Sequence, residues 1–470
     1  MGVVLEGGKI VTAVDSYCSD IRIEDERIVS IGNDIKKSGD EVISVKGCYI
    51  LPGGIDTHTH FDLESGSIAT ADNFETGTKA ALVGGTTTIL DYATQNRGET
   101  LKEALRKQHK KSDGICYCDY GFHMGITDWN DKTSCEMEDM VREGVTSFKL
   151  YMAYKKTLQV DDGVIFEALK RSKELKSLIT FHCENGDIIE SLISEAKSKG
   201  NSSPYYHPLT RPALVEKEAI VRLLNIAEIA DAPVYIVHLS TREGLLSILD
   251  AKKRGIKVYA ETCPQYLLLD DSCYGDKNSH NFEGAKYVMS PPLRKTYDND
   301  ALWKGISSRE IMTIGTDHCS FNYKGQKEVG IDDFSKIPNG APGVEHRIGL
   351  MYTYGVLKNR ISMNEMVALT STNAAKLFGL FPQKGTIAVG SDADIVVWDP
   401  AFPKVISVKN QIQNVDYTPY EGFEQKGRVL HAFLRGNKVI SNGKFIEDKP
   451  LGKYLYRKTQ PEDISYGKSF

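Results

Sequence analysis

Short apolar runs alternate with longer amphipathic segments through the middle of the chain, from about residue 50 to residue 320. A short apolar run bounded by turn residues indicates a buried β-strand, whereas apolar positions spaced three and four apart indicate a helix. The runs predict strands at residues 86–92, 120–126, 147–152, 178–184, 233–239, 257–263 and 311–317. The amphipathic segments predict helices at residues 101–110, 163–175, 211–229 and 244–254.

One more apolar run precedes these strands and ends in His58 and His60. With it, eight strands alternate with helices, which favours a closed (β/α)8 TIM-like barrel over an open doubly wound sheet. We therefore predict an α/β protein whose barrel spans residues 50–383, with a helix at residues 365–378 closing it.

The two ends of the chain have a different pattern. Residues 1–49 contain short apolar strands separated by turn signals, and similar strands return at residues 395–398, 429–434 and 438–440. We predict that residues 1–49 and 384–450 together build one small β-sandwich domain. Residues 451–470 are polar and rich in Tyr and Lys, and they are predicted to be a tail that packs on a neighbouring subunit.

Composition narrows the classes of function. The chain has 470 residues, a formal net charge of -5 and no basic run, so it lacks the electrostatic footprint of a protein that binds nucleic acid or an anionic membrane. We expect a small-molecule partner or another copy of the chain. Without a signal-peptide pattern or a long apolar stretch, the sequence predicts a cytoplasmic protein. The 9 cysteines form no Cys-x-x-Cys pair, which argues against a thiolate zinc site.

Residue types that bind metals stand at the ends of several predicted strands. Because side chains alternate along a strand, His58 and His60 point to the same side and could share a metal. Functional residues of such barrels lie at the carboxyl ends of the strands. That rim collects six candidates: His58, His60, Lys149, His182, His238 and Asp317. The histidines in helical or loop contexts are predicted to lie at the surface: His109, His207, His280 and His431.

Lys149 is the unusual member of this group, because an ammonium cannot bind a cation. If burial lowers its pKa, the neutral amine can take up carbon dioxide and become an anionic carbamate. Such a group has two oxygens, one for each of two metals. The alternative interpretation is a salt-bridged lysine, which the surrounding histidines make less attractive.

A series of short motifs lies in order along nearly the whole chain: residues 52–60 (PGGIDTHTH), 148–151 (FKLY), 181–185 (FHCEN), 237–240 (VHLS), 261–267 (ETCPQYL), 289–294 (MSPPLR), 315–318 (GTDH) and 338–340 (PNG). Together they resemble the cyclic amidohydrolases of the hydantoinase and dihydropyrimidinase family. Residues 382–385 (PQKG) and 417–423 (YTPYEGF) look most like the bacterial phenylhydantoinase branch.

The resemblance implies a binuclear metal centre, usually of zinc, that hydrolyses a cyclic amide through a hydroxide bridging the two ions. One ion would be held by His58, His60 and Asp317, and the other by His182 and His238. Carboxylated Lys149 would bridge both. Asp317 would also act as the general acid and base, taking the proton of the hydroxide and passing it to the ring nitrogen.

Three further residues receive roles only through the resemblance. Tyr154 matches the tyrosine that donates its hydroxyl to the developing oxyanion, and backbone groups of Ser290 and Asn339 would bind the substrate ring. The implied reaction is hydrolysis of D-5-substituted hydantoins such as phenylhydantoin to N-carbamoyl amino acids. Family members are commonly homotetramers, which we carry over as an expectation.

Other relatives remain as alternatives. Dihydropyrimidinase, which opens 5,6-dihydrouracil, shares the ligands and the tyrosine and is the main one. Allantoinases generally lack a tyrosine at the position of Tyr154, and dihydroorotases carry an arginine where this chain has Asp62. The non-catalytic dihydropyrimidinase-related proteins lose metal ligands, whereas every ligand position is filled here.

Overall fold

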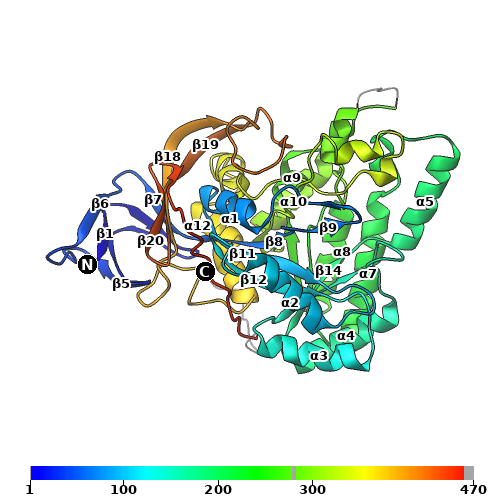
Figure 1. Ribbon diagram of the computed structural model, residues 1–470, viewed down its shortest axis with the longest axis horizontal. Coiled ribbons are helices and arrows are strands. Elements are labelled where there is room, and N and C mark those ends of the chain that lie inside the picture. The colour runs from blue at the N-terminus through cyan, green and yellow to red at the C-terminus, as the bar shows by residue number, and fades with distance from the viewer. Residues whose placement is uncertain (1, 278–281, 460–470) are drawn as a thin grey trace.

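The computed structural model describes residues 2–277 and 282–459, and its largest sheet has eight strands that follow one another in chain order (Figure 1). Each neighbouring pair is parallel. The strands are β8 (Gly54–Thr59), β11 (Thr86–Thr94), β12 (Asp119–Gly125), β13 (Ser147–Tyr151), β14 (Leu178–His182), β15 (Val234–Ile236), β16 (Val258–Thr262) and β17 (Thr313–Ile314). Beyond β17, the His318 N–H donates to His58 O (3.3 Å) and the His60 N–H to His318 O (2.8 Å), which closes the sheet. The predicted (β/α)8 barrel is confirmed.

Helices surround this sheet, and capping side chains set where several of them begin. Thr100 accepts a hydrogen bond from the Glu103 N–H at the start of α2, and the Glu103 carboxylate accepts one from the Thr100 N–H. The longer helices are α1 (Phe74–Val83), α2 (Leu101–Ser112), α3 (Asp131–Arg142), α4 (Asp162–Glu174), α5 (Gly186–Ser198), α7 (Ala213–Ala230), α8 (Arg242–Lys253) and α10 (Thr296–Ser307). The four helices predicted from periodicity are therefore confirmed, with ends that differ by a few residues.

Shorter helical segments complete the barrel and its loops. The predicted helix at residues 365–378 is made of α12 (Met363–Val367), the π-helical η6 (Ala368–Thr372) and α13 (Asn373–Leu377). The others are α6 (Tyr206–Leu209), α9 (Pro264–Leu268), α11 (Arg347–Leu350), η1 (Asp271–Tyr274), η2 (Phe282–Tyr287), η3 (Lys327–Gly330), η4 (Phe334–Lys336) and η5 (Met351–Val356). A small hairpin, β9 (Glu64–Ser65) with β10 (Ile68–Ala69), follows the first barrel strand.

Two further sheets lie beside the barrel, at the left of Figure 1, and the larger of them combines strands from the two ends of the chain. The larger has the order β21-β20-β19-β18-β7-β2-β3, and its central pair joins β7 to β18 in antiparallel fashion. Its strands are β2 (Lys9–Val11), β3 (Ser16–Cys18), β7 (Tyr49–Pro52), β18 (Ile395–Val405), β19 (Glu424–Leu434), β20 (Asn437–Ser441) and β21 (Lys444–Phe445). The smaller contains β1 (Val3–Glu6), β4 (Asp20–Glu24), β5 (Arg27–Gly32) and β6 (Glu41–Ser44).

An apolar core of its own lies between these two sheets, with Leu5, Ile21 and Ile28 from the first fifty residues and Ile395 and Phe433 from the last hundred. Because neither segment can bury its apolar face alone, the two segments fold together. The prediction that distant segments build one β unit is confirmed, while the limits of the domains stay a prediction.

Residues 451–458 run along the barrel of their own chain. The backbone N–H of Gly452 donates to Cys116 O (2.8 Å), and that of Leu455 donates to Tyr120 O (2.8 Å). The remainder of the predicted tail, residues 460–470, lies outside the described residues. Among the helices of residues 2–277 and 282–459, none combines the length and the apolar character needed to span a lipid bilayer.

Candidate metal centre

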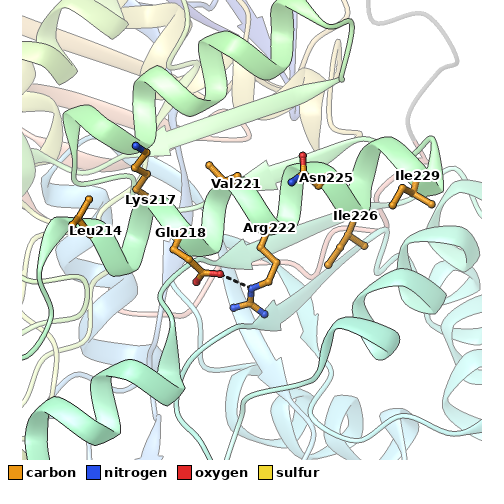
Figure 2. Close-up of a pocket in the computed structure, with 8 residues that line it drawn as sticks. All are labelled: Leu214, Lys217, Glu218, Val221, Arg222, Asn225, Ile226 and Ile229. Atoms are coloured by element: carbon orange, nitrogen blue, oxygen red, sulfur yellow. Dashed lines mark hydrogen bonds and ion pairs between the residues drawn. The ribbon is translucent and has the colours of Figure 1, made fainter.

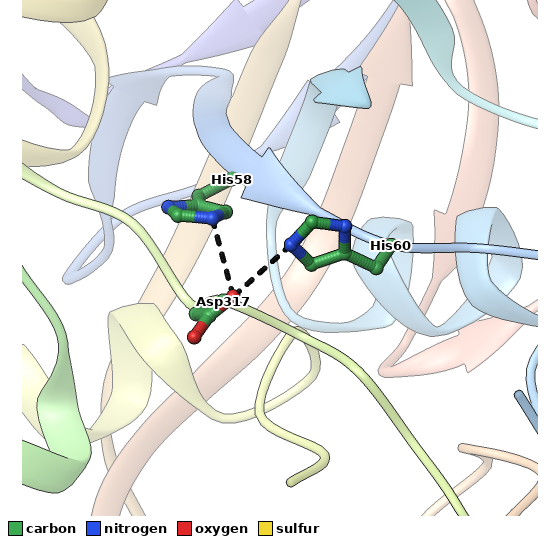
Figure 3. Close-up of side chains that lie close together, drawn as sticks. All are labelled: His58, His60 and Asp317. Atoms are coloured by element: carbon green, nitrogen blue, oxygen red, sulfur yellow. Dashed lines mark ion pairs between the residues drawn. The ribbon is translucent and has the colours of Figure 1, made fainter. Parts of the chain in front are cut away.

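Three of the candidate ligands meet where the first and last barrel strands join. His58 is the penultimate residue of β8, His60 directly follows this strand, and Asp317 follows β17 by three residues. Both Nε2 atoms lie 3.2 Å from the same oxygen, Oδ1 of Asp317 (Figure 3). Asp317 adopts a positive φ of 52°, an uncommon conformation for a residue other than glycine and one that clusters at functional sites. The strand end thus turns the carboxylate toward both imidazoles.

The other two histidines form a second pair next to this group. Nδ1 of His182, the last residue of β14, lies 2.9 Å from Nε2 of His238, which follows β15. His238 also has a positive φ, of 38°. Its ring stacks on His58 with a centroid separation of 5.4 Å, so the two groups share one site.

Lys149, in the middle of β13, is buried at the same rim. Its Nζ lies 5.1 Å from the ring centre of Tyr92, and that ring also packs on His58 (5.0 Å) and His60 (4.8 Å). Burial lowers the pKa of Lys149 to about 8, although the nearby Asp317 opposes this shift. A minor fraction of this amine is therefore neutral near physiological pH, and the neutral amine is the form that can react with carbon dioxide.

Two glutamates behind the imidazoles determine which ring nitrogens carry protons. Oε1 of Glu261 lies 2.7 Å from Nδ1 of His58, and Oε2 of Glu184 lies 2.9 Å from Nε2 of His182. Each carboxylate accepts a hydrogen bond from the nitrogen that faces it, so the lone pairs of His58 Nε2 and His182 Nδ1 point into the site. A carboxylate that accepts from the outer nitrogen is the usual arrangement behind metal-binding histidines.

This arrangement fits cations. Burial lowers the pKa of His58 well below its usual value, so its Nε2 has no proton to offer to the Asp317 oxygen that it faces. Two lone pairs at 3.2 Å repel one another unless a positive charge lies between them. His60 Nε2 faces the same oxygen. Nitrogen and oxygen donors in this combination suit a divalent metal such as zinc.

The supporting glutamates were not assigned a role from the sequence. Glu261 accepts hydrogen bonds from the hydroxyls of Thr57 (2.5 Å) and Tyr235 (2.9 Å). Burial raises the pKa of Glu261, and these two donors oppose the rise. Burial acts to raise the pKa of Glu184 as well, but the guanidinium of Arg211, 2.6 Å away, and His182 outweigh this effect and lower the pKa to about 2. The only sequence signal was position, since both glutamates stand at strand ends.

The residues implied for substrate binding lie over the same rim. Tyr154 has a positive φ of 66°, and its ring centre lies 5.0 Å from that of His182. Burial raises the pKa of Tyr154, which keeps the hydroxyl protonated and able to donate a hydrogen bond. Ser290 Oγ donates to Oδ1 of Asn339 at 2.7 Å, which joins the two turns in which these residues lie.

The predicted surface histidines give a mixed outcome. His207 is buried, and its Nε2 donates to Met289 O at 2.7 Å, so the prediction for this residue is wrong. His431 is also buried, in β19. The loops that cross the barrel rim bury polar residues as well as apolar ones, which periodicity does not reveal. His109 is partly exposed and His280 lies outside the described residues.

A model of the amidohydrolase family matches residues 49–439. The chain belongs to this family. It is 46% identical to a D-hydantoinase of Geobacillus stearothermophilus, over 97% of this chain and 96% of that protein. It is 40% identical to a D-phenylhydantoinase of Escherichia coli, over 97% of this chain and 98% of that protein. A solved structure of a dihydropyrimidinase from Brevibacillus agri matches with a TM-score of 0.96 at 46% identity, covering 98% of this chain and 100% of that one. Within the family, the resemblance to the hydantoinase and dihydropyrimidinase branch is confirmed.

Proposed function

We propose that the protein hydrolyses the cyclic amide bond of D-5-substituted hydantoins, such as phenylhydantoin, to N-carbamoyl amino acids. This proposal rests on two pairs of imidazoles that meet at one rim of the barrel, His58 with His60 and His182 with His238. The buried amine of Lys149 lies beside them. The near full-length similarity to a D-hydantoinase supports the choice of substrate class.

Two divalent ions, zinc in the first instance, are the proposed cofactors. His58, His60 and Asp317 would hold one, His182 and His238 the other, and carboxylated Lys149 would bridge them; the inward lone pairs of His58 and His182 support this assignment. When bound, such a pair of ions polarises a carbonyl and lowers the pKa of water, so that hydrolysis proceeds at neutral pH.

The protein side chains then move protons and stabilise charge. As a ligand of a cation, Asp317 would be ionised, because a positive charge beside a carboxyl favours its charged form. In that form it could accept the proton of the attacking water and return it to the leaving ring nitrogen. The protonated Tyr154 hydroxyl is proposed to donate to the substrate oxygen as negative charge develops there.

Backbone groups of Ser290 and Asn339 are proposed to bind the amide and carbonyl edge of the substrate ring. This edge is common to hydantoins and dihydropyrimidines, so the two turns would hold the ring while other loops contact the substituent. The hydrogen bond between the two side chains keeps these turns together.

Ring opening of 5,6-dihydrouracil is the second candidate activity. The solved structure from Brevibacillus agri, named a dihydropyrimidinase, is 46% identical to this chain. An allantoinase or a non-catalytic scaffold has less support, because the chain has a tyrosine at position 154, with its ring centre 5.0 Å from that of His182, and a suitable residue type at every candidate ligand position.

The proposed assembly is a homotetramer, and α7 offers a surface for it. Leu214 and Ile229, near the two ends of this helix, are 65% and 75% exposed. Together with Val221 and Ile226 they line a shallow depression of about 630 Å³, with Lys217, Glu218 and Arg222 beside them (Figure 2). Exposed apolar patches rimmed by charges are typical of protein interfaces. Light scattering on protein that elutes from a size-exclusion column measures the mass of the assembly, which we expect to be that of a homotetramer.

One side-by-side assay tests the proposed function. Purified protein is loaded with zinc and offered both enantiomers of phenylhydantoin, hydantoin, dihydrouracil, allantoin and dihydroorotate. We expect the highest kcat/KM with D-phenylhydantoin and a lower value with dihydrouracil. A preference for allantoin or dihydroorotate would contradict the proposal, as would inactivity with every cyclic amide by protein that contains metal.

A further inference from the structure

Lys327 is a buried lysine that the proposed mechanism does not use. It is the first residue of η3, in the segment that crosses the rim after β17, and its side chain is 0% exposed. Its Nζ donates to two backbone carbonyls, Val288 O at 3.0 Å and Pro338 O at 2.9 Å. These acceptors are 50 positions apart in the sequence, so the side chain joins two separate segments.

The two carbonyls belong to the turns that carry Ser290 and Asn339. Val288 precedes Ser290 by two residues, and its oxygen also accepts from the backbone N–H of Gly340 at 3.0 Å. Pro338 immediately precedes Asn339. Lys327 therefore contacts both turns at the point where they already touch each other through the backbone.

Because the peptide unit is rigid, these contacts also fix the directions in which neighbouring backbone N–H groups point. A trans peptide unit is planar, so the N–H of Asn339 points opposite to the carbonyl of Pro338. Since that carbonyl points at Lys327, the N–H of Asn339 points away from it. The peptide unit between Met289 and Ser290 in the other turn is fixed in a similar way. His207 Nε2 donates to Met289 O, so the N–H of Ser290 points away from His207.

The energetic cost of this lysine argues for a positional role. Burial lowers the pKa of Lys327 to about 7, which reflects the penalty for enclosing an ammonium. Another buried lysine, Lys384, has three carboxylates to offset the same penalty. Lys327 donates instead to two neutral carbonyls, which offset less of the penalty. A methionine would fill similar space without the penalty, so what the lysine adds is its pair of N–H donors.

We propose that Lys327 is a positioning residue that sets the spacing and direction of the two turns, residues 288–290 and 338–340, against the ring edge of the substrate. This inference rests on the proposed function, because it concerns the same binding site. The amine has enough N–H groups for both carbonyls whether it is charged or neutral. The two hydrogen bonds of Lys327 go to the backbones of the turns and not to a candidate metal ligand, so Lys327 acts through these backbones.

The test compares Lys327→Met with wild type and with Lys336→Met, a control that removes an exposed lysine in the same segment. Each zinc-loaded protein is assayed with hydantoin, D-phenylhydantoin and dihydrouracil, and its metal content is counted. We expect Lys327→Met to raise KM by about tenfold to a hundredfold, since small misplacements of binding groups have effects of this size. The rise is similar for all three substrates, because the turns bind the edge that they share, and metal content is unchanged. Lys336→Met behaves as wild type.

Other outcomes overturn the inference. An unchanged KM in folded, metal-loaded Lys327→Met, or a loss of activity that follows a loss of metal, removes the positioning role. If Lys327→Met does not fold, Lys327→Gln takes its place. Its amide keeps N–H donors but reaches fewer acceptors than the lysine, so we expect KM to rise, by less than the roughly tenfold to hundredfold expected for Lys327→Met. Failure of both variants to fold would show that Lys327 is a purely structural residue. Inactive wild-type protein would instead refute the proposed function itself.

Discussion

Two buried lysines at opposite ends of the barrel show how surroundings decide what one residue type does. Lys149 lies at the carboxyl end among imidazole and aromatic rings, and burial lowers its pKa to about 8. Lys384 lies near the amino end of β12, where its Nζ is 2.7 Å from Asp119 and 2.5 Å from Asp394. Burial opposes the charge of Lys384 as well, but these carboxylates raise its pKa above the usual value. The first lysine is suited to react, and the second is a fixed cation.

The same contrast separates the two clusters of metal-binding residue types in the described part of the chain. Asp119, Asp392 and Asp394 resemble a cation site, but Lys384 already supplies a positive charge to all three. Among the described residues, Asp317 forms no ion pair with a lysine or an arginine, and its close partners are the His58 and His60 imidazoles. A group of ligands therefore indicates a metal site only when its charge is not already balanced by the protein.

Lys149→Ala should have the largest effect on function. Removing the proposed bridging group is expected to lower kcat/KM by more than about a thousandfold, because several kcal/mol of metal-dependent stabilisation would be lost. Bound metal should fall in parallel, and short carboxylic acids should restore part of the activity by occupying the vacated space. A fully active Lys149→Ala protein would exclude the bridging role.

Lys384→Met should affect stability rather than catalysis. It leaves three buried carboxylates without their shared cation, which is expected to cost about 3–5 kcal/mol in the free energy of unfolding. Urea titrations of this variant, of wild type and of the surface control Lys358→Met measure the difference. Metal content and KM of the folded protein should stay at wild-type values. A variant with wild-type stability but altered metal content would contradict the structural role assigned to Lys384.

Tyr154→Phe tests the role of the tyrosine hydroxyl at the carboxyl end of the barrel. Loss of one hydroxyl that donates to the developing charge is expected to lower kcat by about a hundredfold or more, while both metals stay bound. Tyr297→Phe, which changes a half-exposed tyrosine on α10, is the matched control. Equal kinetics of Tyr154→Phe and wild type would argue against the oxyanion role.

Glu184→Gln should have the smallest effect of the four. The amide can still contact His182 but no longer favours the tautomer that presents Nδ1 to a metal, so zinc affinity is expected to fall by about tenfold to a hundredfold. Competition with a chromophoric chelator measures it, with Glu190→Gln on the exposed face of α5 as control. An unchanged affinity for zinc would mean that Glu184 pairs with Arg211 but does not control the tautomer of His182.

Sequence patterns predicted the barrel well because its strands are continuous apolar runs and its helices keep their periodicity. The candidate ligands were found because strand alternation and strand ends are local features. Contacts between distant residues were not predictable in this way. Glu261 and His58 are 203 positions apart, and Lys384 and Asp119 are 265 apart. The role of Lys327 likewise depends on two turns that only the fold brings together.

Conversion of Lys149 into an anionic bridge between two metal ions can be tested by following zinc uptake after a chelator has removed the bound metal. The metal-free protein is returned to zinc either in buffer freed of carbon dioxide or in buffer with ¹³C-bicarbonate. We expect two bound ions per chain and a labelled carbamate only when bicarbonate is present, and neither in Lys149→Ala. Two ions bound without carbon dioxide, or an active protein without the labelled carbamate, would rule out the carbamate bridge.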